Sequence, residues 1–99
     1  MRFEKVIEEI EKLVPGDPDS FLVADVKRNN IEFIQTKRNE DETYHVEIGV
    51  NNGTGMFDGI TIYAADGVSM WKAIRYFALM ATDSPTLPEG FHELKEKRK

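Results

Sequence analysis

Hydrophobic residues recur every three to four positions at the start of the chain, which is typical of a helix with one apolar face. These residues are Phe3, Val6, Ile7, Ile10, Leu13 and Val14. Pro15 and Gly16 follow and end the helix, because residues before proline disfavour helical backbone and glycine permits the exit turn. A helix is therefore predicted over about residues 2–14.

A second helix is predicted over about residues 67–82, with Asp66 as its N-cap. Its body is apolar around most of its circumference. Such a helix lies at the centre of a fold, or part of it forms an interface. We interpret Trp71, Tyr76 and Phe77 as core residues, with a dimer or partner interface as the alternative.

Between these helices, hydrophobic positions alternate with polar ones, which is the period of a strand with one buried side. The predicted strands are residues 21–27, 31–38, 43–50 and 59–64. The connections between them are short, which predicts an antiparallel meander. Pro88 is in a position to start one more short helix, over about residues 89–96, in which Phe91 and Leu94 would dock.

The alternation also assigns side chains to the two faces of the sheet. The residues expected to point inward are Leu22, Ala24, Val26, Tyr44, Val46, Ile48, Ile60 and Ile62. The residues expected to point outward are Asp25, His45, Glu47, Thr61 and Tyr63. The strand over residues 31–38 is ambiguous, and Glu32 joins the outward face if Ile31 and Phe33 point inward. The open face would then carry acids around an exposed tyrosine.

These elements predict a single α+β domain over residues 1–94, followed by a basic tail over residues 95–99. The order is α-β-β-β-β-α with a short extra helix. Antiparallel sheets of this size bury one face under helices, so the helices are expected on one face of the sheet. A chain of 99 residues has room for one such domain.

Charge is unevenly spread along the chain. There are 13 basic and 18 acidic residues, which give a net charge of −5. Four of these bases and one of these acids lie in residues 95–99, so residues 1–94 carry 17 acids, 9 bases and a net charge of −8. A body this acidic is repelled by phosphate backbones and attracted to basic surfaces. We therefore expect no direct contact with nucleic acid, and a protein partner that is basic or binds nucleic acid.

Several function classes lack the residues that they need. The chain has no cysteine, which excludes disulfides, thiolate metal sites and thiol nucleophiles and favours a reducing cytoplasm. The glycine-rich stretch Asn51–Gly59 precedes a strand, whereas phosphate loops precede a helix. We interpret it as a flexible connection, with Met56 and Phe57 as alternative contacts.

Catalytic and metal-binding patterns are not found either. His45 and His92 lack the spacing of a metal site, and no serine lies in a nucleophile motif. No apolar run reaches the ~18 residues of a membrane span. We expect no cofactor, no metal, no membrane association and no catalysis, although a pair of carboxylates for glycoside chemistry stays open.

Two families share features with this chain. Its layout resembles that of the double-stranded-RNA-binding domain, whose second helix begins with lysines that meet phosphates. Here the corresponding residues 67–72 include one lysine, Lys72, in an acidic body, so RNA binding is not expected. Acids gather at Glu4, Glu8, Glu9 and Glu11, in the loop over residues 40–42 and on the predicted outward face of the sheet. In these features the chain resembles small acidic phage-encoded anti-CRISPR inhibitors, which occupy nucleic-acid-binding sites of nucleases by presenting carboxylates.

We therefore expect a non-enzymatic binding protein. In its most specific form it is a phage or mobile-element inhibitor that occupies a basic nucleic-acid-binding groove of a host protein. The residues expected to contact the partner are Glu40, Asp41, Glu42, Glu32, Glu47 and Tyr63. Two alternatives stay open: an assembly module that dimerises or docks through the second helix, and a small ligand-binding domain or hydrolase.

Overall fold

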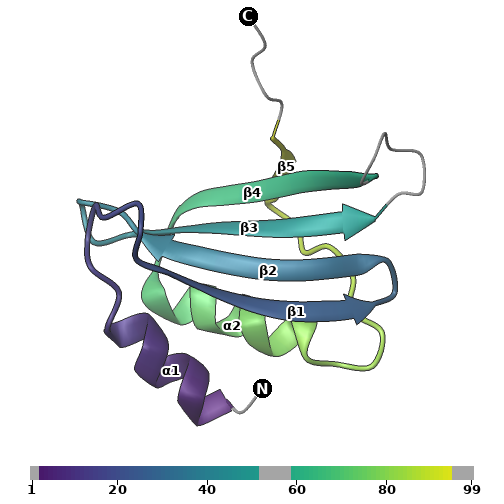
Figure 1. Ribbon diagram of the computed structural model, residues 1–99, viewed down its shortest axis with the longest axis horizontal. Helices are drawn as coiled ribbons and strands as arrows, with labels where there is room; N and C mark the ends of the chain where they lie inside the picture. The colour runs from purple at the N-terminus through teal and green to yellow at the C-terminus, as the bar shows by residue number, and fades with distance from the viewer. Residues whose placement is uncertain (1–2, 52–58, 95–99) are drawn as a thin grey trace, which may run out of the picture.

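An antiparallel sheet whose strand order follows the chain, β1-β2-β3-β4-β5, forms one layer of the structure (Figure 1). The computed structural model describes residues 3–51 and 59–94. The elements within these residues are α1 (Phe3–Glu11), β1 (Phe21–Arg28), β2 (Ile31–Arg38), β3 (Tyr44–Asn51), β4 (Ile60–Val68), α2 (Met70–Met80) and β5 (His92–Glu93). The predicted α+β class, with an N-terminal helix, an antiparallel meander and a C-terminal helix, is confirmed.

Both helices share one hydrophobic core with a single face of the sheet. Val6 and Ile10 reach it from α1, and Ile74 and Phe77 reach it from α2. The strand residues in this core are Val26, Ile31, Ile34, Tyr44, Val46 and Ile48. α1 ends earlier than predicted, at Glu11, and a turn then carries the buried side chain of Leu13 into the same core. The opposite face of the sheet is the open face.

α2 begins later than predicted, because β4 continues through Val68. Asp66 was the expected N-cap, but it lies within β4, and Ser69 caps the helix instead. The hydroxyl of Ser69 accepts a hydrogen bond of 3.2 Å from the backbone N–H of Lys72. A bulge in the β3–β4 ladder adds one residue to β4 here, and Gly67 adopts a φ of +69°, which glycine tolerates best.

The short helix predicted over residues 89–96 is wrong where the structure describes it. His92 and Glu93 form β5, which pairs with Ala64 and Tyr63 of β4. The N–H of Leu94 also donates to the carbonyl oxygen of Ile62 at 2.7 Å. Pairing with the edge of β4 satisfies backbone groups that a lone turn of helix would leave exposed, and it covers part of that edge.

The two faces of β4 are the reverse of the prediction. Ile48 of β3 lies opposite Tyr63, and Gly49 lies opposite Ile62. Directly opposed residues share a face, so Tyr63 lies on the side of the core and Ile62 lies on the open face. Alternation separates a strand into two sets of side chains, but the pairing register decides which set faces inward.

The ambiguity in β2 is resolved by a bulge between Ile31 and Phe33. Ile31 and Ile34 point into the core, while Phe33 lies on the open face. A methyl group placed on Gly49 would lie 2.4 Å from Cε2 of Phe33, so the Phe33 ring covers this glycine. On β1, Val26 is buried and Asp25 is exposed, as predicted.

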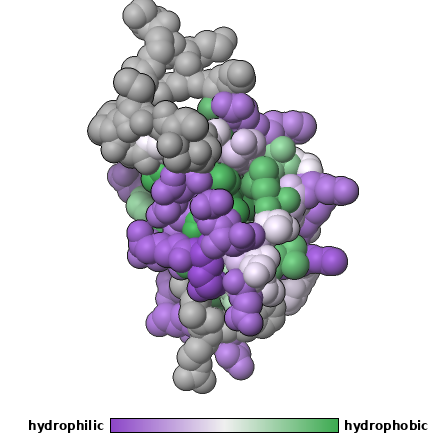
Figure 2. Space-filling view, turned by 90° about the vertical axis from the view of Figure 1, so that its right-hand side faces the viewer, coloured by the Kyte–Doolittle hydropathy of each residue, from purple (hydrophilic) through white to green (hydrophobic). Residues whose placement is uncertain are grey.

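The turn between β1 and β2 is tied to the end of α2. Arg28 donates from Nη2 to the carbonyl oxygen of Met80 at 2.7 Å and from Nε to that of Thr82 at 3.0 Å. Nδ2 of Asn29 donates to the carbonyl oxygen of Pro85 at 2.6 Å. Figure 2 looks onto this end of the molecule, where hydrophilic side chains gather at the centre of the face. These bonds fix the helix layer to the first hairpin.

Candidate functional site

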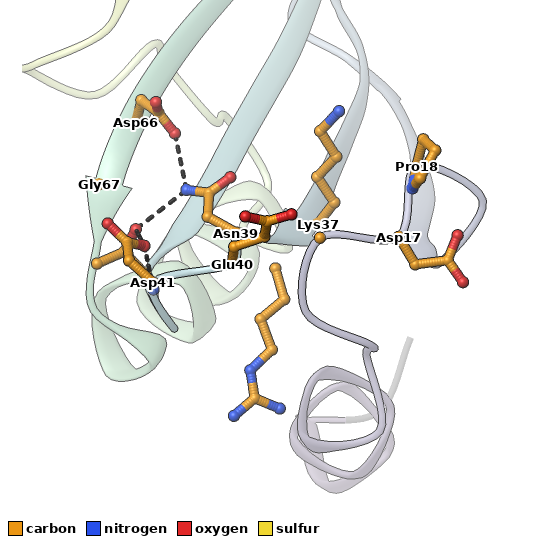
Figure 3. Close-up of a pocket in the computed structure, with 11 residues that line it drawn as sticks. Asp17, Pro18, Lys37, Asn39, Glu40, Asp41, Asp66 and Gly67 are labelled. Atoms are coloured by element: carbon orange, nitrogen blue, oxygen red, sulfur yellow. Dashed lines mark hydrogen bonds between the residues drawn. The ribbon is translucent and has the colours of Figure 1, made fainter.

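Three segments that are distant in the chain meet at the other end of the sheet, and they line an open depression of about 510 Å³. The segments are the loop after α1, the hairpin between β2 and β3, and the end of β4. Four of the lining residues are acids, Asp17, Glu40, Asp41 and Asp66, and we call them the acidic rim. Figure 3 shows Asp66 and Asp41 on one side of the depression and Asp17 on the other, with Glu40 and Lys37 between them.

The hairpin places two of these acids through its own hydrogen bonds. Oδ1 of Asp41 accepts from the backbone N–H of Thr43 at 3.0 Å and from its hydroxyl at 2.6 Å, as in an Asx turn. Glu42 completes the turn with a φ of +75°. The side chain of Glu40 lies across Gly16, where an added methyl group would approach its Cγ to 2.4 Å. Gly16 in turn donates its N–H to the carbonyl oxygen of Arg38 at 2.9 Å.

Asp66 is joined to the hairpin by Asn39. Nδ2 of Asn39 donates to Oδ1 of Asp66 and to Oγ1 of Thr43, both at 3.0 Å. The hydrogen bond from Asn39 is the main reason that the pKa of Asp66 lies below its usual value of 3.8, with a further contribution from His45 and partial opposition from burial. Bonds from Thr43 likewise lower the pKa of Asp41. Both carboxylates are therefore charged at neutral pH.

A row of polar side chains continues from Asp66 across the open face. Nδ1 of His45 lies 3.1 Å from Oδ1 of Asp66, and its Nε2 lies 2.9 Å from Oε2 of Glu47. Gln35 donates to the other oxygen of Glu47 at 3.3 Å. His45 of β3 thus lies between two carboxylates and links β3 to Asp66 of β4.

The other residues predicted to contact a partner lie apart from the acidic rim. Glu42 binds the guanidinium group of Arg38, which also donates to the carbonyl oxygen of Leu13 at 3.2 Å. Glu32 pairs with Lys27 at 3.5 Å and accepts from Nδ2 of Asn51 at 3.3 Å. Glu47 is bound within the polar row, and Tyr63 is not on the open face, contrary to the expectation of an exposed tyrosine there.

Two acids of the rim, Asp17 and Asp66, are not among the residues predicted to contact a partner. The sequence predicts a loop at Asp17, and no local pattern places this residue beside the hairpin over residues 39–43. The sequence predicts Asp66 as a helix cap. The alternation of Ile60, Ile62 and Ala64, continued by one more step, would instead place Asp66 on the same face of an extended β4. The Met56 and Phe57 contacts considered in the sequence lie outside the described residues.

Comparison of the chain with protein-family models, with curated proteins and with solved structures finds no match. Among residues 3–51 and 59–94, no group of three or more histidine, aspartate or glutamate side chains is arranged to hold a metal ion. No helix in the same residues is long and apolar enough to cross a membrane.

Proposed function

We propose that this chain is a small non-enzymatic binding protein that docks its acidic rim onto a basic surface of a protein partner. One observation carries this proposal. Within the described part of the chain, no lysine or arginine forms an ion pair with Asp17, Glu40, Asp41 or Asp66, whereas the lysine and arginine ion pairs go to Glu9, Glu32 and Glu42. The rim thus brings together four carboxylates that form no ion pair with a lysine or arginine of the described residues, although Lys37 and Arg38 line the same depression.

Gathering like charges in one place costs free energy until a cation arrives. The charge of Asp66 already acts against ionisation of Asp41, so the two carboxylates repel each other. Arginine and lysine side chains from a partner would relieve this repulsion, and arginine could bind a carboxylate through two parallel hydrogen bonds. Such complementarity favours specificity and fast association, and it weakens as salt is added.

The chemistry of the rim favours a protein partner over nucleic acid. Residues 1–94 carry 17 acids, 9 bases and a net charge of −8, which opposes contact with phosphates. In its most specific form, the proposal is a cytoplasmic inhibitor from a phage or mobile element. Its carboxylates would occupy a host groove that otherwise binds nucleic acid. The absence of cysteine from the sequence supports the cytoplasm as the compartment.

Charge reversal within the rim tests this proposal directly. Wild-type protein and the double variant Glu40→Lys, Asp41→Lys would be immobilised and exposed to host lysate at low and high salt. The matched control is Glu4→Lys, Glu8→Lys, which changes the net charge equally at two exposed positions of α1. We expect the wild type and the control to retain the same basic protein, and the rim variant to lose it.

A second measurement asks whether the partner surface is a nucleic-acid groove. Adding the purified protein to the captured partner should displace a bound oligonucleotide, and the rim variant should not displace it. Equal retention of the partner by all three proteins would refute the proposed role of the rim. Recovery of no basic protein by any of them would refute the proposed partner class.

A further inference from the structure

The outer side of α2 carries a stripe of residues that the fold itself does not use. Trp71, Arg75 and Leu79 follow one another at a spacing of four, so they lie in a line along the helix. Trp71 is 64% exposed and Leu79 is 41% exposed, although we expected Trp71 in the core from the sequence. Tyr76 and Phe77, on the opposite side, are buried as expected.

A depression of about 490 Å³ lies beside this stripe. It is lined by Trp71, Lys72, Arg75, Tyr76, Pro88 and Glu89. Tyr76 is 5% exposed and packs edge-on against Phe91, with 4.9 Å between ring centroids, so this wall of the depression is fixed by the core. An exposed tryptophan and an arginine next to a preformed hollow are the residue types that dominate the free energy of many protein interfaces.

The charge of this surface is opposite to that of the rest of the body. Among residues 70–80, Lys72 and Arg75 are the only charged residues. Neither forms an ion pair with another described residue, and both are exposed. Glu89 is the single acid that lines the depression. In a body with a net charge of −8, two unpaired cations beside an exposed tryptophan form a local basic and apolar patch.

We propose that this patch docks an acidic segment of a protein partner that also carries an apolar anchor. Carboxylates of the segment pair with Lys72 and Arg75, and the apolar anchor packs against Trp71 and Leu79. The patch is separate from the acidic rim and does not depend on the role proposed for it. Complementary charge selects the class of partner, and the desolvated tryptophan supplies most of the contact area.

A second copy of this chain fits the patch poorly in a two-fold contact of α2 with itself. In a two-fold dimer the same surface meets itself, and Arg75 stands at the middle of the stripe. An antiparallel contact of α2 with its copy would therefore bring two Arg75 guanidinium groups together, with Lys72 of each copy nearby and no acid on α2 to compensate. Nucleic acid is disfavoured by the acidic body.

Trp71 is the only tryptophan of the chain, so its fluorescence reports on this patch alone. Quenching by iodide and by caesium measures the sign of the local potential. Normalised to free tryptophan, iodide should quench about twofold more strongly than caesium, because the nearby cations concentrate anions. The variant Lys72→Glu, Arg75→Glu should reverse the order. Stronger quenching of the wild type by caesium would overturn the proposed charge of the patch.

Binding is tested with a synthetic peptide of glutamates with leucines spaced four apart, and with the same peptide carrying lysine in place of glutamate. The acidic peptide should shift the Trp71 emission to shorter wavelength in a saturable way. The variant Lys72→Glu, Arg75→Glu should bind about tenfold more weakly or worse. The matched control Lys5→Glu, Lys12→Glu changes two cations of the α1 region and should bind like the wild type.

The remaining outcomes each overturn the proposal. No saturable shift, an equal response to the lysine peptide, or equal weakening by the control variant would mean that the patch does not select an acidic segment. A concentration-dependent dimer in sedimentation, with the same shift in emission and no peptide, would assign the patch to a second copy. An equal shift with single-stranded oligothymidine would assign it to nucleic acid.

Discussion

Replacing Gly49 with alanine should destabilise the protein because Phe33 occupies the space that the new methyl group needs. An alanine Cβ would lie 2.4 Å from Cε2, 2.7 Å from Cζ and 2.9 Å from Cδ2 of the Phe33 ring. Carbon atoms in favourable contact are about 3.5–4.0 Å apart, so the ring must move by roughly 1 Å or more. Gly49 has no positive φ, and the backbone itself accepts alanine.

Two opposing effects determine how much Gly49→Ala changes the free energy of unfolding. Forcing the ring from its packed position resembles overpacking, which costs about 1–3 kcal/mol. Alanine also restricts the unfolded chain more than glycine does, which contributes about 0.5–1 kcal/mol in favour of folding. The net loss in the free energy of unfolding should be about 1–2 kcal/mol. In a Phe33→Ala background the ring is gone, and Gly49→Ala should instead stabilise the fold by about 0.5–1 kcal/mol.

A double-mutant cycle measures this change of sign. Urea unfolding followed by circular dichroism on the wild type, both single variants and the double variant gives the coupling energy, which should be about 2 kcal/mol. If Gly49→Ala has the same effect in both backgrounds, the ring does not cover the glycine. The packing of the Phe33 ring over Gly49 would then be refuted.

Three further predictions follow from individual contacts. Ser69→Ala removes the cap of α2 and should lower the free energy of unfolding by about 1 kcal/mol in urea; no loss would contradict the cap. Asn39→Ala removes the main cause of the lowered pKa of Asp66, so an NMR titration should show this pKa rising toward 3.8. Because the pKa of Asp66 is depressed in the folded state, its contribution to the free energy of unfolding is present above pH 3.8 and disappears as the pH falls through the lowered pKa. An unchanged titration of Asp66 in the variant would contradict the hydrogen bond from Asn39. Arg38→Met should lower the free energy of unfolding in urea by only about 1 kcal/mol, rather than the roughly 3–5 kcal/mol typical of a broken buried ion pair. The reason is that Nε of Arg38 has no hydrogen-bond partner among the described residues and the Glu42 side chain is 61% exposed; a larger loss would contradict this reasoning.

The positions of β1, β2 and β3 were predictable because each is a run of strand-forming residues that ends at a turn signal. β2 lies at the predicted residues, β1 ends one residue later than predicted, and β3 both begins and ends one residue later. The faces were less predictable where both alternating sets contain apolar residues. In β4, Ile60 and Ile62 compete with Tyr63 and Ala65, and only the pairing with β3 decides between them.

The acidic rim was predictable only in its hairpin part. Glu40 and Asp41 are adjacent in the chain, so their clustering follows from sequence. Asp17 and Asp66 join them through tertiary contacts that leave no local pattern. Trp71 shows the converse difficulty, since an almost wholly apolar helix does not reveal which side meets the core.

The contact of Arg28 with the end of α2 has a consequence for the order of folding events. In β1 to β4 each strand pairs with its neighbour in the chain, so these hairpins close short loops and form at little entropic cost. The bonds from Arg28 to Met80 and Thr82 span 52 and 54 residues and can form only when α2 docks. We therefore expect Arg28→Ala to leave the folding rate nearly unchanged and to accelerate unfolding. The bonds of Arg28 would then determine how long the protein stays folded and not how fast it folds.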